Sequence, residues 1–493
     1  MGIVIRQSIK GTFVNYIGAF IGFVTTFFIF TKYLQTEEVG FIGVLYQAAL
    51  MIANFALMGI TASAIRFFPH FKNSENKDNG FFFYLLIPPT IGLIICIPIY
   101  LVLKAPISDY FSNGSSLLAD YYNWVIPLIC IVVYWMTFET YSNLKMRIAV
   151  PKFIREVLLR IMHLIVYLLY AFKVLDIDSF VASYILVYGI ALLITLLYIN
   201  KIGNLTLKHD FSFLSKNLRQ SIAKYTGVLV LGVLSTGLLY QLELFMVSGE
   251  LGLNYGGIYW VAFNIGVIVE IPSRSIGAIA SPIAAKSLIE NNISEANLLY
   301  KKVALHQLIA GGLIFLFVWI NIDNIFAIMP KGDEYSAGKW VVFFIAISKL
   351  VSVTFNFGTT LVSFSKYYYW MLPFSILLTV LGITANLLLI PKLGITGASI
   401  AALVTCTVSY VIQQIIILLK LKGNPFSLSL FKFLTLLCVA FALNHILPMW
   451  SEYPIVDGLY RTLIVGTISV ISLYKLKISE EVCMIINNFF KIK

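Results

Sequence analysis

The sequence has little charge for its length. Only 12% of its 493 residues are charged, 59% are hydrophobic, and the mean hydropathy is +0.89. Soluble domains carry about one quarter charged residues, so this composition does not supply a water-compatible surface for a folded domain. The composition therefore excludes a soluble enzyme and predicts a membrane protein.

Cysteine is also scarce, and its spacing forms no motif. The five cysteines are isolated from one another, at Cys96, Cys130, Cys406, Cys438 and Cys483. No pair has the C-x-x-C spacing of a zinc or redox site, which favours buried small hydrophobic residues. The stretch from Gly332 to Lys339 is similar to a phosphate loop, but it has one residue too many between its glycines. We therefore expect no metal, nucleotide or other cofactor.

Long apolar runs make up most of the chain. A helix needs about 20 apolar residues to cross a bilayer, and about fourteen such runs occur. They lie near 11–31, 39–65, 80–103, 121–144, 157–172, 179–200, 225–249, 255–285, 303–321, 340–365, 367–390, 394–419, 433–450 and 458–474. The runs are continuous rather than alternating, which favours helices over a β-barrel. The sequence therefore predicts an all-α polytopic membrane protein.

The net charge of +12 has a topological explanation. Counted loop by loop, about 25 Lys and Arg residues fall on one side of the membrane and about 7 on the other. Basic residues concentrate on the cytoplasmic side of membrane proteins, so we predict that both termini are cytoplasmic. A nucleic-acid site would need these residues on one folded face, and we expect no nucleic-acid partner.

The two halves of the sequence show weak internal repetition. An offset of about 217 residues aligns Gly40 with Gly257 and Gln47 with Asn264, and an offset of 216 aligns Ser183 with Ser399. The repeat predicts two six-helix lobes in a pseudo-twofold arrangement, followed by two C-terminal helices. Substrate sites in such folds lie between the halves, near the middle of the membrane.

The repeat also sets the predicted domain boundaries. We predict an N-terminal lobe at 1–200, a cytoplasmic connector at 201–224, a C-terminal lobe at 225–420, and two further helices with a basic cytoplasmic tail at 421–493. Leu214, Leu218 and Ile222 recur every four residues among basic residues of the connector. This pattern predicts an amphipathic helix on the inner membrane surface.

Several short motifs resemble one family of membrane transporters. They are the acidic turn Leu34-Gln-Thr-Glu-Glu-Val-Gly40, the segment Ala64-Ile-Arg-Phe-Phe-Pro69, the start Gly257-Ile-Tyr259 and end Ser281-Pro282 of one span, and the turn Pro391-Lys-Leu-Gly-Ile-Thr-Gly-Ala398. Together they resemble the bacterial lipid-linked oligosaccharide flippases of the polysaccharide-export and O-antigen type. These belong to the multidrug/oligosaccharidyl-lipid/polysaccharide (MOP) exporter superfamily, and the resemblance covers most of the chain.

The resemblance implies a function and a location. It implies a transporter, not an enzyme, that moves an oligosaccharide on a polyprenyl diphosphate carrier from the cytoplasmic to the outer leaflet by alternating access. The product would serve cell-surface polysaccharide or lipopolysaccharide synthesis, with polymerase or assembly proteins as partners. The expected location is the bacterial cytoplasmic (inner) membrane.

Charges inside membrane spans are costly, so each is a candidate cavity residue. We consider four cations as candidates for binding the diphosphate: Arg66, Arg160, Arg274 and Lys349. Each has a structural alternative. Arg274 lies one turn after Glu270 and would pair with it, Lys349 would snorkel or pair with a neighbouring helix, and Arg160 would anchor at the inner interface. Arg66 lies at the inner end of its span, where a phosphate would enter.

Acidic residues inside the spans are candidates for ion coupling. Glu243 and Glu270 could bind H⁺ or Na⁺, or they could serve as buried partners of Arg274 or Lys349. Glu139 lies nearer the inner end of its span, and we expect it to pair with Lys145.

Three other functions remain as alternatives. A multidrug exporter of the same superfamily would usually carry an acidic residue in its first helix, and a peptidoglycan-precursor flippase would carry several arginines there. The run at 11–31 has neither. A membrane glycosyl polymerase or ligase would need a sizeable outer loop, and the longest predicted outer loops, near 104–120 and 322–339, are too short for a catalytic domain.

Overall fold

The structure is a computed structural model of the chain. It describes residues 14, 17–72, 77–111, 117–145, 147–203, 205–206, 215–236, 239–290, 292–450 and 452–490. Within these ranges the chain is helical and has no strand, which confirms the all-α fold. Contacts divide it into two compact units, Met1–Gly257 and Ile258–Lys493, which we call the first and the second unit.

The described residues contain ten helices that are long and apolar enough to cross a membrane, together with a shorter apolar helix, Ile17–Tyr33. Every predicted span has a helical counterpart among them or in a pair of shorter helices. The polytopic architecture is therefore confirmed. The lobe boundaries at 1–200 and 225–420 stay predictions.

The predicted connector is only partly within the described residues. Leu214 lies outside them, together with the rest of 207–214. Lys216–Thr236 (α12) is one continuous helix, so Leu218 and Ile222 belong to the helix that leads into the predicted span at 225–249. The position of the connector on the membrane surface stays a prediction.

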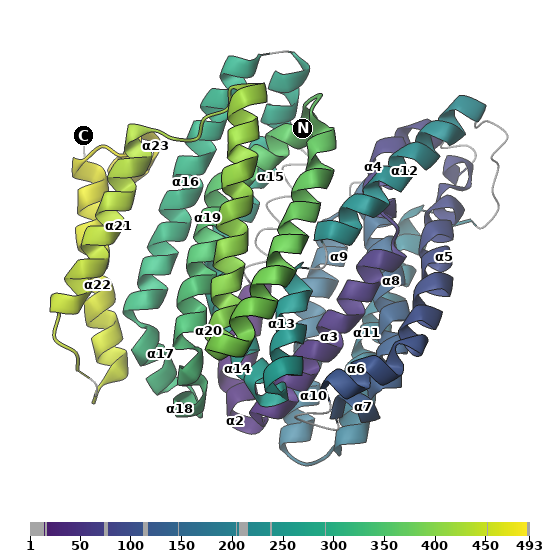
Figure 1. Ribbon diagram of the computed structural model, residues 1–493, viewed down its shortest axis with the longest axis horizontal. Coiled ribbons are helices and arrows are strands. Elements are labelled where there is room, and N and C mark those ends of the chain that lie inside the picture. The colour runs from purple at the N-terminus through teal and green to yellow at the C-terminus, as the bar shows by residue number, and fades with distance from the viewer. Residues whose placement is uncertain are drawn as a thin grey trace. The chain divides into compact units, whose positions relative to one another are not determined.

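In the first unit, α3 and α8 are the most buried of the long apolar helices, and both are labelled in the purple-to-blue part of Figure 1. Its helical elements are η1 (Thr25–Phe30), α2 (Thr31–Tyr33), α3 (Thr36–Ala56), α4 (Ile60–Phe71), η2 (Lys77–Gly80), α5 (Phe81–Val102), α6 (Lys104–Phe111), α7 (Leu117–Asp120), η3 (Tyr122–Trp124), α8 (Val125–Leu144), α9 (Ala149–Phe153), η4 (Ile154–Leu158), α10 (Leu159–Ala171), α11 (Ile177–Gly203), α12 and α13 (Leu239–Leu251). Helix α3 packs on α5, α8 and α13, and α8 packs on α11.

Helix α3 begins at a capping box. The Gln35 side chain accepts from the backbone at Glu38, and the Glu38 carboxylate accepts from the Gln35 backbone N–H at 2.9 Å. This arrangement satisfies donors that a helix start leaves open. The same carboxylate accepts a hydrogen bond from the Tyr170 hydroxyl of α10. The acidic turn that the sequence singled out therefore sets the start of α3 and ties it to α10.

Two glycines that the sequence offset aligns, Gly40 and Gly257, are in reciprocal close contact within the first unit. A Cβ atom on Gly40 would lie 2.0 Å from the carbonyl oxygen of Leu253, and one on Gly257 would lie 1.9 Å from that of Thr36. Thr36 and Leu253 are the first residues of α3 and of α14 (Leu253–Gly266). Each glycine therefore packs on the first turn of the other helix. Only a residue without a side chain allows this approach.

The second unit continues with helices that pack mainly through α16, α19 and α20. Its elements after α14 are η5 (Val267–Glu270), α15 (Ile271–Ile289), α16 (Ile293–Ile320), α17 (Ile322–Ile328), α18 (Gly332–Tyr335), η6 (Ser336–Gly338), α19 (Lys339–Phe364), η7 (Tyr368–Trp370), α20 (Met371–Leu421), α21 (Leu428–Ile446), α22 (Pro454–Lys475) and α23 (Glu480–Phe490). Helix α20 contains both predicted spans at 367–390 and 394–419. They are separated at Gly394, whose φ of 60° and ψ of −142° suit glycine.

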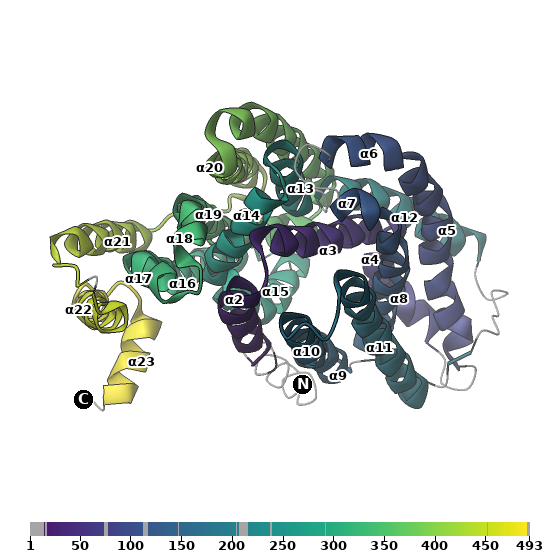
Figure 2. The same cartoon turned by 90° about the horizontal axis from the view of Figure 1, so that it is seen from below.

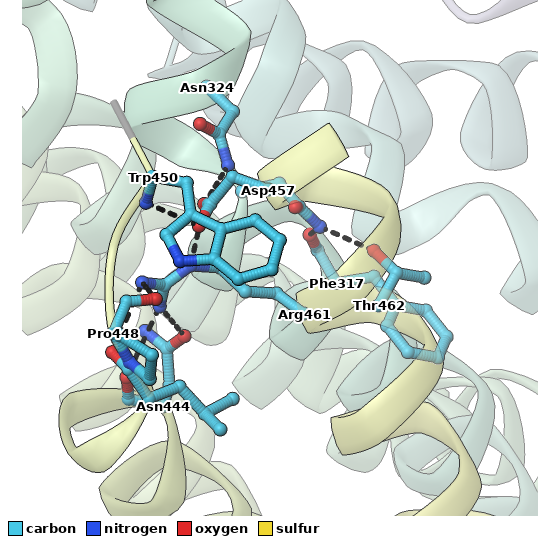
Figure 3. A network of polar contacts seen from close by, with 10 residues as sticks. Phe317, Asn324, Asn444, Pro448, Trp450, Asp457, Arg461 and Thr462 are labelled. Carbon is cyan, nitrogen blue, oxygen red and sulfur yellow. Dashed lines mark hydrogen bonds and ion pairs between the residues drawn. The ribbon is translucent and has the colours of Figure 1, made fainter. Parts of the chain in front are cut away.

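The C-terminal helices form an edge of the second unit, where α21 packs on α16 and α22 packs on α17 and α21 (Figure 2). A buried polar network joins them (Figure 3). The Nε atom of Arg461 donates to Asp457 at 2.7 Å, and its Nη1 atom donates to the Asn444 side chain at 2.6 Å. Asp457 also accepts from Asn324 of α17 at 2.7 Å. Arg461 is therefore a structural ion-pair residue within the predicted span at 458–474.

The glycine contact predicts that an added methyl group lowers stability at Gly257 but not at a glycine with free space around it. We expect Gly257→Ala to lower stability by about 1–3 kcal/mol, because overpacking at a close backbone contact costs that much. The measurement is thermal unfolding of the purified protein in detergent. Gly227→Ala in α12 is the matched control, because a Cβ there meets no atom within 4 Å. Equal melting temperatures for the two variants would contradict the contact.

Candidate functional site

Two of the predicted spans, those at 39–65 and 255–285, are interrupted near their middles. In the first, α3 ends at Ala56 and α4 begins at Ile60, and between them Met58 and Gly59 have left-handed φ angles of 47° and 67°. In the second, the 3-10 turn η5 separates α14 from α15. The offset of 217 places Met58 and Gly59 opposite residues 275 and 276 of α15, a few residues after η5, so the two breaks do not align exactly. Interrupted helices in the middle of the membrane are nevertheless common at substrate and ion sites of transporters.

The break in the second unit carries an ion pair between a buried lysine and a half-buried glutamate. The Lys349 ammonium of α19 lies 3.1 Å from a carboxylate oxygen of Glu270 in η5, and the two side chains are 8% and 30% exposed. The ammonium also lies 5.8 Å from the ring centroid of Phe263. The predicted coupling acid Glu270 is thus the counter-ion of the predicted cavity cation Lys349. This matches one of the alternatives that the sequence left open.

Two other predicted site residues, Arg274 and Glu243, are assigned to their helices but not to a role. Arg274 lies in α15, one turn after Glu270, but its side chain is outside the described part of the chain. Glu243 lies in α13 and is 5% exposed. The roles predicted for both residues stay predictions.

The first unit contains a second set of charges among its spans, which we call the ion quartet: Glu139, Arg155, Glu156 and Arg160. Arg155 donates to both carboxylate oxygens of Glu139 at 2.9 Å. It also donates to Glu156 at 3.1 Å, and Arg160 donates to Glu156 at 3.0 Å. The quartet has two positive and two negative charges, so its net charge is zero. It joins α8 to η4 and α10.

The quartet corrects one sequence expectation. Glu139 was expected to pair with Lys145, but its partner is Arg155, and the Lys145 ammonium pairs with Asp78. The expectation was wrong because Arg155 precedes the predicted span at 157–172, whereas η4 brings it into the helix bundle. The spacing of Glu156 and Arg160, four residues apart at the start of a span, was an available signal of this pairing.

Arg66 has different surroundings from the other predicted cations. It lies in the second half of α4 and is exposed. Its guanidinium carbon lies 4.3 Å from the ring centroid of Tyr225 in α12 and 5.7 Å from that of Phe67. In the described part of the chain it makes no ion pair with a carboxylate. A guanidinium stacked on a ring keeps its N–H edges available to an anion.

The electrostatics of these sites separate them into two kinds. Lys349 and Arg160 are already neutralised by glutamates, which lowers the cost of holding them among apolar helices. Arg66 carries a charge that is not balanced by a carboxylate in the described residues, and its planar group suits bidentate contact with phosphate. Among the predicted cations with a described side chain, Arg66 is therefore the best suited to receive an anion.

Comparisons with known proteins agree with this architecture. A solved structure described as lipid II flippase MurJ, inward closed conformation, is similar with a TM-score of 0.70 at 13% identity, covering 96% of this chain and 99% of that chain. An inward-facing multidrug resistance MATE family transporter of the MOP superfamily has a TM-score of 0.60 at 14% identity, covering 85% and 100%. A MOP superfamily transporter from Pyrococcus furiosus has a TM-score of 0.57 at 12% identity, covering 86% and 96%.

These similarities define a multi-pass membrane protein with the fold of the MOP superfamily transporters. A family model described as polysaccharide biosynthesis protein matches residues 4–286, which is more than half of the chain. The chain therefore belongs to the polysaccharide biosynthesis protein family. No curated protein matches the sequence.

The buried pair predicts a double-mutant signature. We expect Lys349→Met alone to destabilise the protein by about 3–5 kcal/mol, because it leaves Glu270 without its counter-ion among apolar helices. Lys349→Met combined with Glu270→Leu should recover most of that loss. The measurement is unfolding of each variant in detergent micelles.

The exposed pair of Lys286 and Glu290, 3.8 Å apart, is the matched control. Removing its lysine should change stability by less than about 1 kcal/mol. A single Lys349→Met variant as stable as that control would show that the pair near η5 contributes nothing.

Proposed function

We propose that the protein is a flippase for a lipid-linked oligosaccharide. It moves a sugar chain on a polyprenyl diphosphate carrier from the cytoplasmic to the outer leaflet by alternating access, and the product serves cell-surface polysaccharide synthesis. The membership of the polysaccharide biosynthesis family supports the substrate class. We place the protein in the bacterial cytoplasmic membrane with both termini in the cytoplasm.

The observation that carries the proposal is the guanidinium of Arg66, which forms no ion pair with a carboxylate of the described residues. A diphosphate diester carries two negative charges at neutral pH and needs fixed cations at the point where it leaves the lipid headgroup region. Arg66 offers a positive charge and a planar set of N–H donors, with Tyr225 and Phe67 as aromatic neighbours. Phe67 is buried and Tyr225 is only partly buried, so Tyr225 is the ring that can also stack on a sugar face.

The other charges have supporting roles in this proposal. Arg160, Arg274 and Lys349 stabilise the diphosphate further along its path. Glu243 and Glu270 are the candidate acids for coupling to H⁺ or Na⁺. Net transport toward the outer leaflet needs a driving force. An ion gradient is one such force, and consumption of the substrate by a polymerase or assembly protein on the outer side is another.

A second candidate is a flippase for a peptidoglycan precursor. The solved structure with a TM-score of 0.70 is described as a lipid II flippase and covers 96% of this chain, which supports this alternative. The carrier chemistry of the two candidates is the same, because lipid II also has a polyprenyl diphosphate. They differ in the sugar, and therefore in the cell wall or surface polymer that is lost when the gene is deleted.

The proposal predicts a strong effect at Arg66. We expect Arg66→Ala to reduce the delivery of surface polysaccharide at least tenfold in a deletion strain that carries the variant, and Arg66→Lys to keep part of it. A lysine keeps the charge but lacks the bidentate geometry. The measurement is the amount of surface polymer, together with the lipid-linked precursor that accumulates on the cytoplasmic leaflet.

Lys72→Ala is the matched control, since Lys72 is an exposed cation just after the end of α4. Delivery through that variant should be normal at equal expression. Normal delivery through Arg66→Ala would remove Arg66 from the substrate path, and a deletion strain without accumulated precursor would refute the flippase itself.

A further inference from the structure

The first apolar helix packs on α10 through two glycines, Gly18 and Gly22. A Cβ atom on Gly18 would lie 2.4 Å from the carbonyl oxygen of Glu156, and one on Gly22 would lie 2.3 Å from Nη1 of Arg160. The glycines are four residues apart, as are Glu156 and Arg160. One face of the first helix therefore rests directly on the i,i+4 ion pair of η4 and α10.

Arg160 also makes a polar contact with the first helix. Its Nη1 atom donates to the backbone carbonyl of Gly18, and its Nη2 atom donates to Glu156 at 3.0 Å. One guanidinium thus holds two different acceptors. The carboxylate is the stronger of the two, because a hydrogen bond to an ionised acceptor is about twice as strong as one to a neutral acceptor. The bond to the first helix is the one that a competing anion would replace.

The ion quartet presents its cations more openly than its anions. The side chains of Arg155 and Arg160 are 41% and 36% exposed, whereas those of Glu139 and Glu156 are 16% and 14% exposed. An anion that approaches the quartet therefore meets the guanidinium groups first. A diphosphate could contact both arginines while each keeps its glutamate, with the Gly18 carbonyl as the acceptor that is given up.

Both helices at this contact contain a segment of π-helix. One is η1, which starts three residues after Gly22, and the other is η4, which contains Glu156. A π-helical segment has an extra residue in its turn, and such segments are frequent at functional sites. Conversion of such a segment to α-helix changes the register of the following residues. The first helix is thus able to change its course next to the Arg160 contact.

We propose that Arg160 is a substrate-sensitive tether. Binding of a polyprenyl diphosphate at Arg155 and Arg160 transfers Nη1 of Arg160 from the Gly18 carbonyl to a phosphate oxygen, and the first helix is released from α10. Substrate binding is thereby linked to movement of one helix of the first unit. This inference rests on the proposed function, because it requires a diphosphate-bearing lipid as substrate.

The test measures the distance between the first helix and α10. Spin labels would be attached to cysteines at Phe20→Cys and Ile165→Cys, which are 68% and 51% exposed, after the five native cysteines are replaced by serine. We expect undecaprenyl diphosphate to shift the distance distribution to longer values, and undecaprenol, which has no phosphate, to leave it unchanged. Hydrogen exchange of residues 17–33 in the unlabelled protein should accelerate with the diphosphate lipid alone.

Two variants separate a tether from a simple packing contact. Arg160→Gln should give the longer distance without lipid and show no further shift. Gly22→Ala should do the same, because its methyl group displaces the guanidinium. Gly189→Ala is the matched control, since a Cβ there meets only Ile131 at 3.8 Å, and it should respond to lipid as the wild type does.

The possible outcomes distinguish this inference from the function on which it rests. Saturable binding of undecaprenyl diphosphate, detected by a thermal shift, with no change in the distance or in hydrogen exchange would overturn the tether and leave the flippase proposal intact. A complete lack of binding by the wild-type protein would overturn the flippase proposal. Binding with the distance change in the wild type and its loss in Arg160→Gln would support the tether.

Discussion

A charge among apolar helices must be neutralised or reach water, and this constraint governs the polar interior of the molecule. Lys349 is held by Glu270, Arg461 by Asp457, and Arg160 by Glu156. Desolvation of an unpaired ion costs several kcal/mol, so each of these cations is held next to its carboxylate. The pairs of Arg461 and Arg160 lie four residues apart along the chain, whereas the pair of Lys349 and Glu270 joins α19 to η5. Against this background, Arg66 is informative because its exposed guanidinium is stacked on an aromatic ring and is not balanced by a carboxylate in the described residues.

Close contact between helix backbones is the second feature that holds the helices together. Gly40 and Gly257 allow the starts of α3 and α14 to meet, and Gly18 and Gly22 allow the first helix to rest on Glu156 and Arg160. Small residues are needed there because lipid tails are as apolar as the side chains, so packing and polar contacts drive association between helices. The two kinds of contact coincide at Arg160, where close packing brings a guanidinium within reach of a backbone carbonyl.

The sequence predicts the helices well and the pairing of charges poorly. Long apolar runs locate the spans because a bilayer fixes their length, and Gly394 marks the turn inside α20 because its backbone conformation suits glycine. The sequence offset aligned Gly40 with Gly257 as repeat equivalents, but it did not predict that the two glycines contact each other's helices. The partner of Glu139 was not predictable from hydropathy, because Arg155 lies at the edge of a span and enters the bundle through η4. The partner of Glu270 was left open between two cations for the same reason: pairing depends on which helix faces which.

The central claim is that this protein moves a diphosphate-linked saccharide across a bilayer. The most direct measurement uses purified protein in liposomes that contain a fluorescent undecaprenyl diphosphate oligosaccharide, with an impermeant quencher added outside. We expect active protein to make the inner-leaflet pool accessible to the quencher, and we expect no added exchange in liposomes whose labelled lipid has no diphosphate. An unchanged protected pool in liposomes with correctly folded protein would contradict the claim.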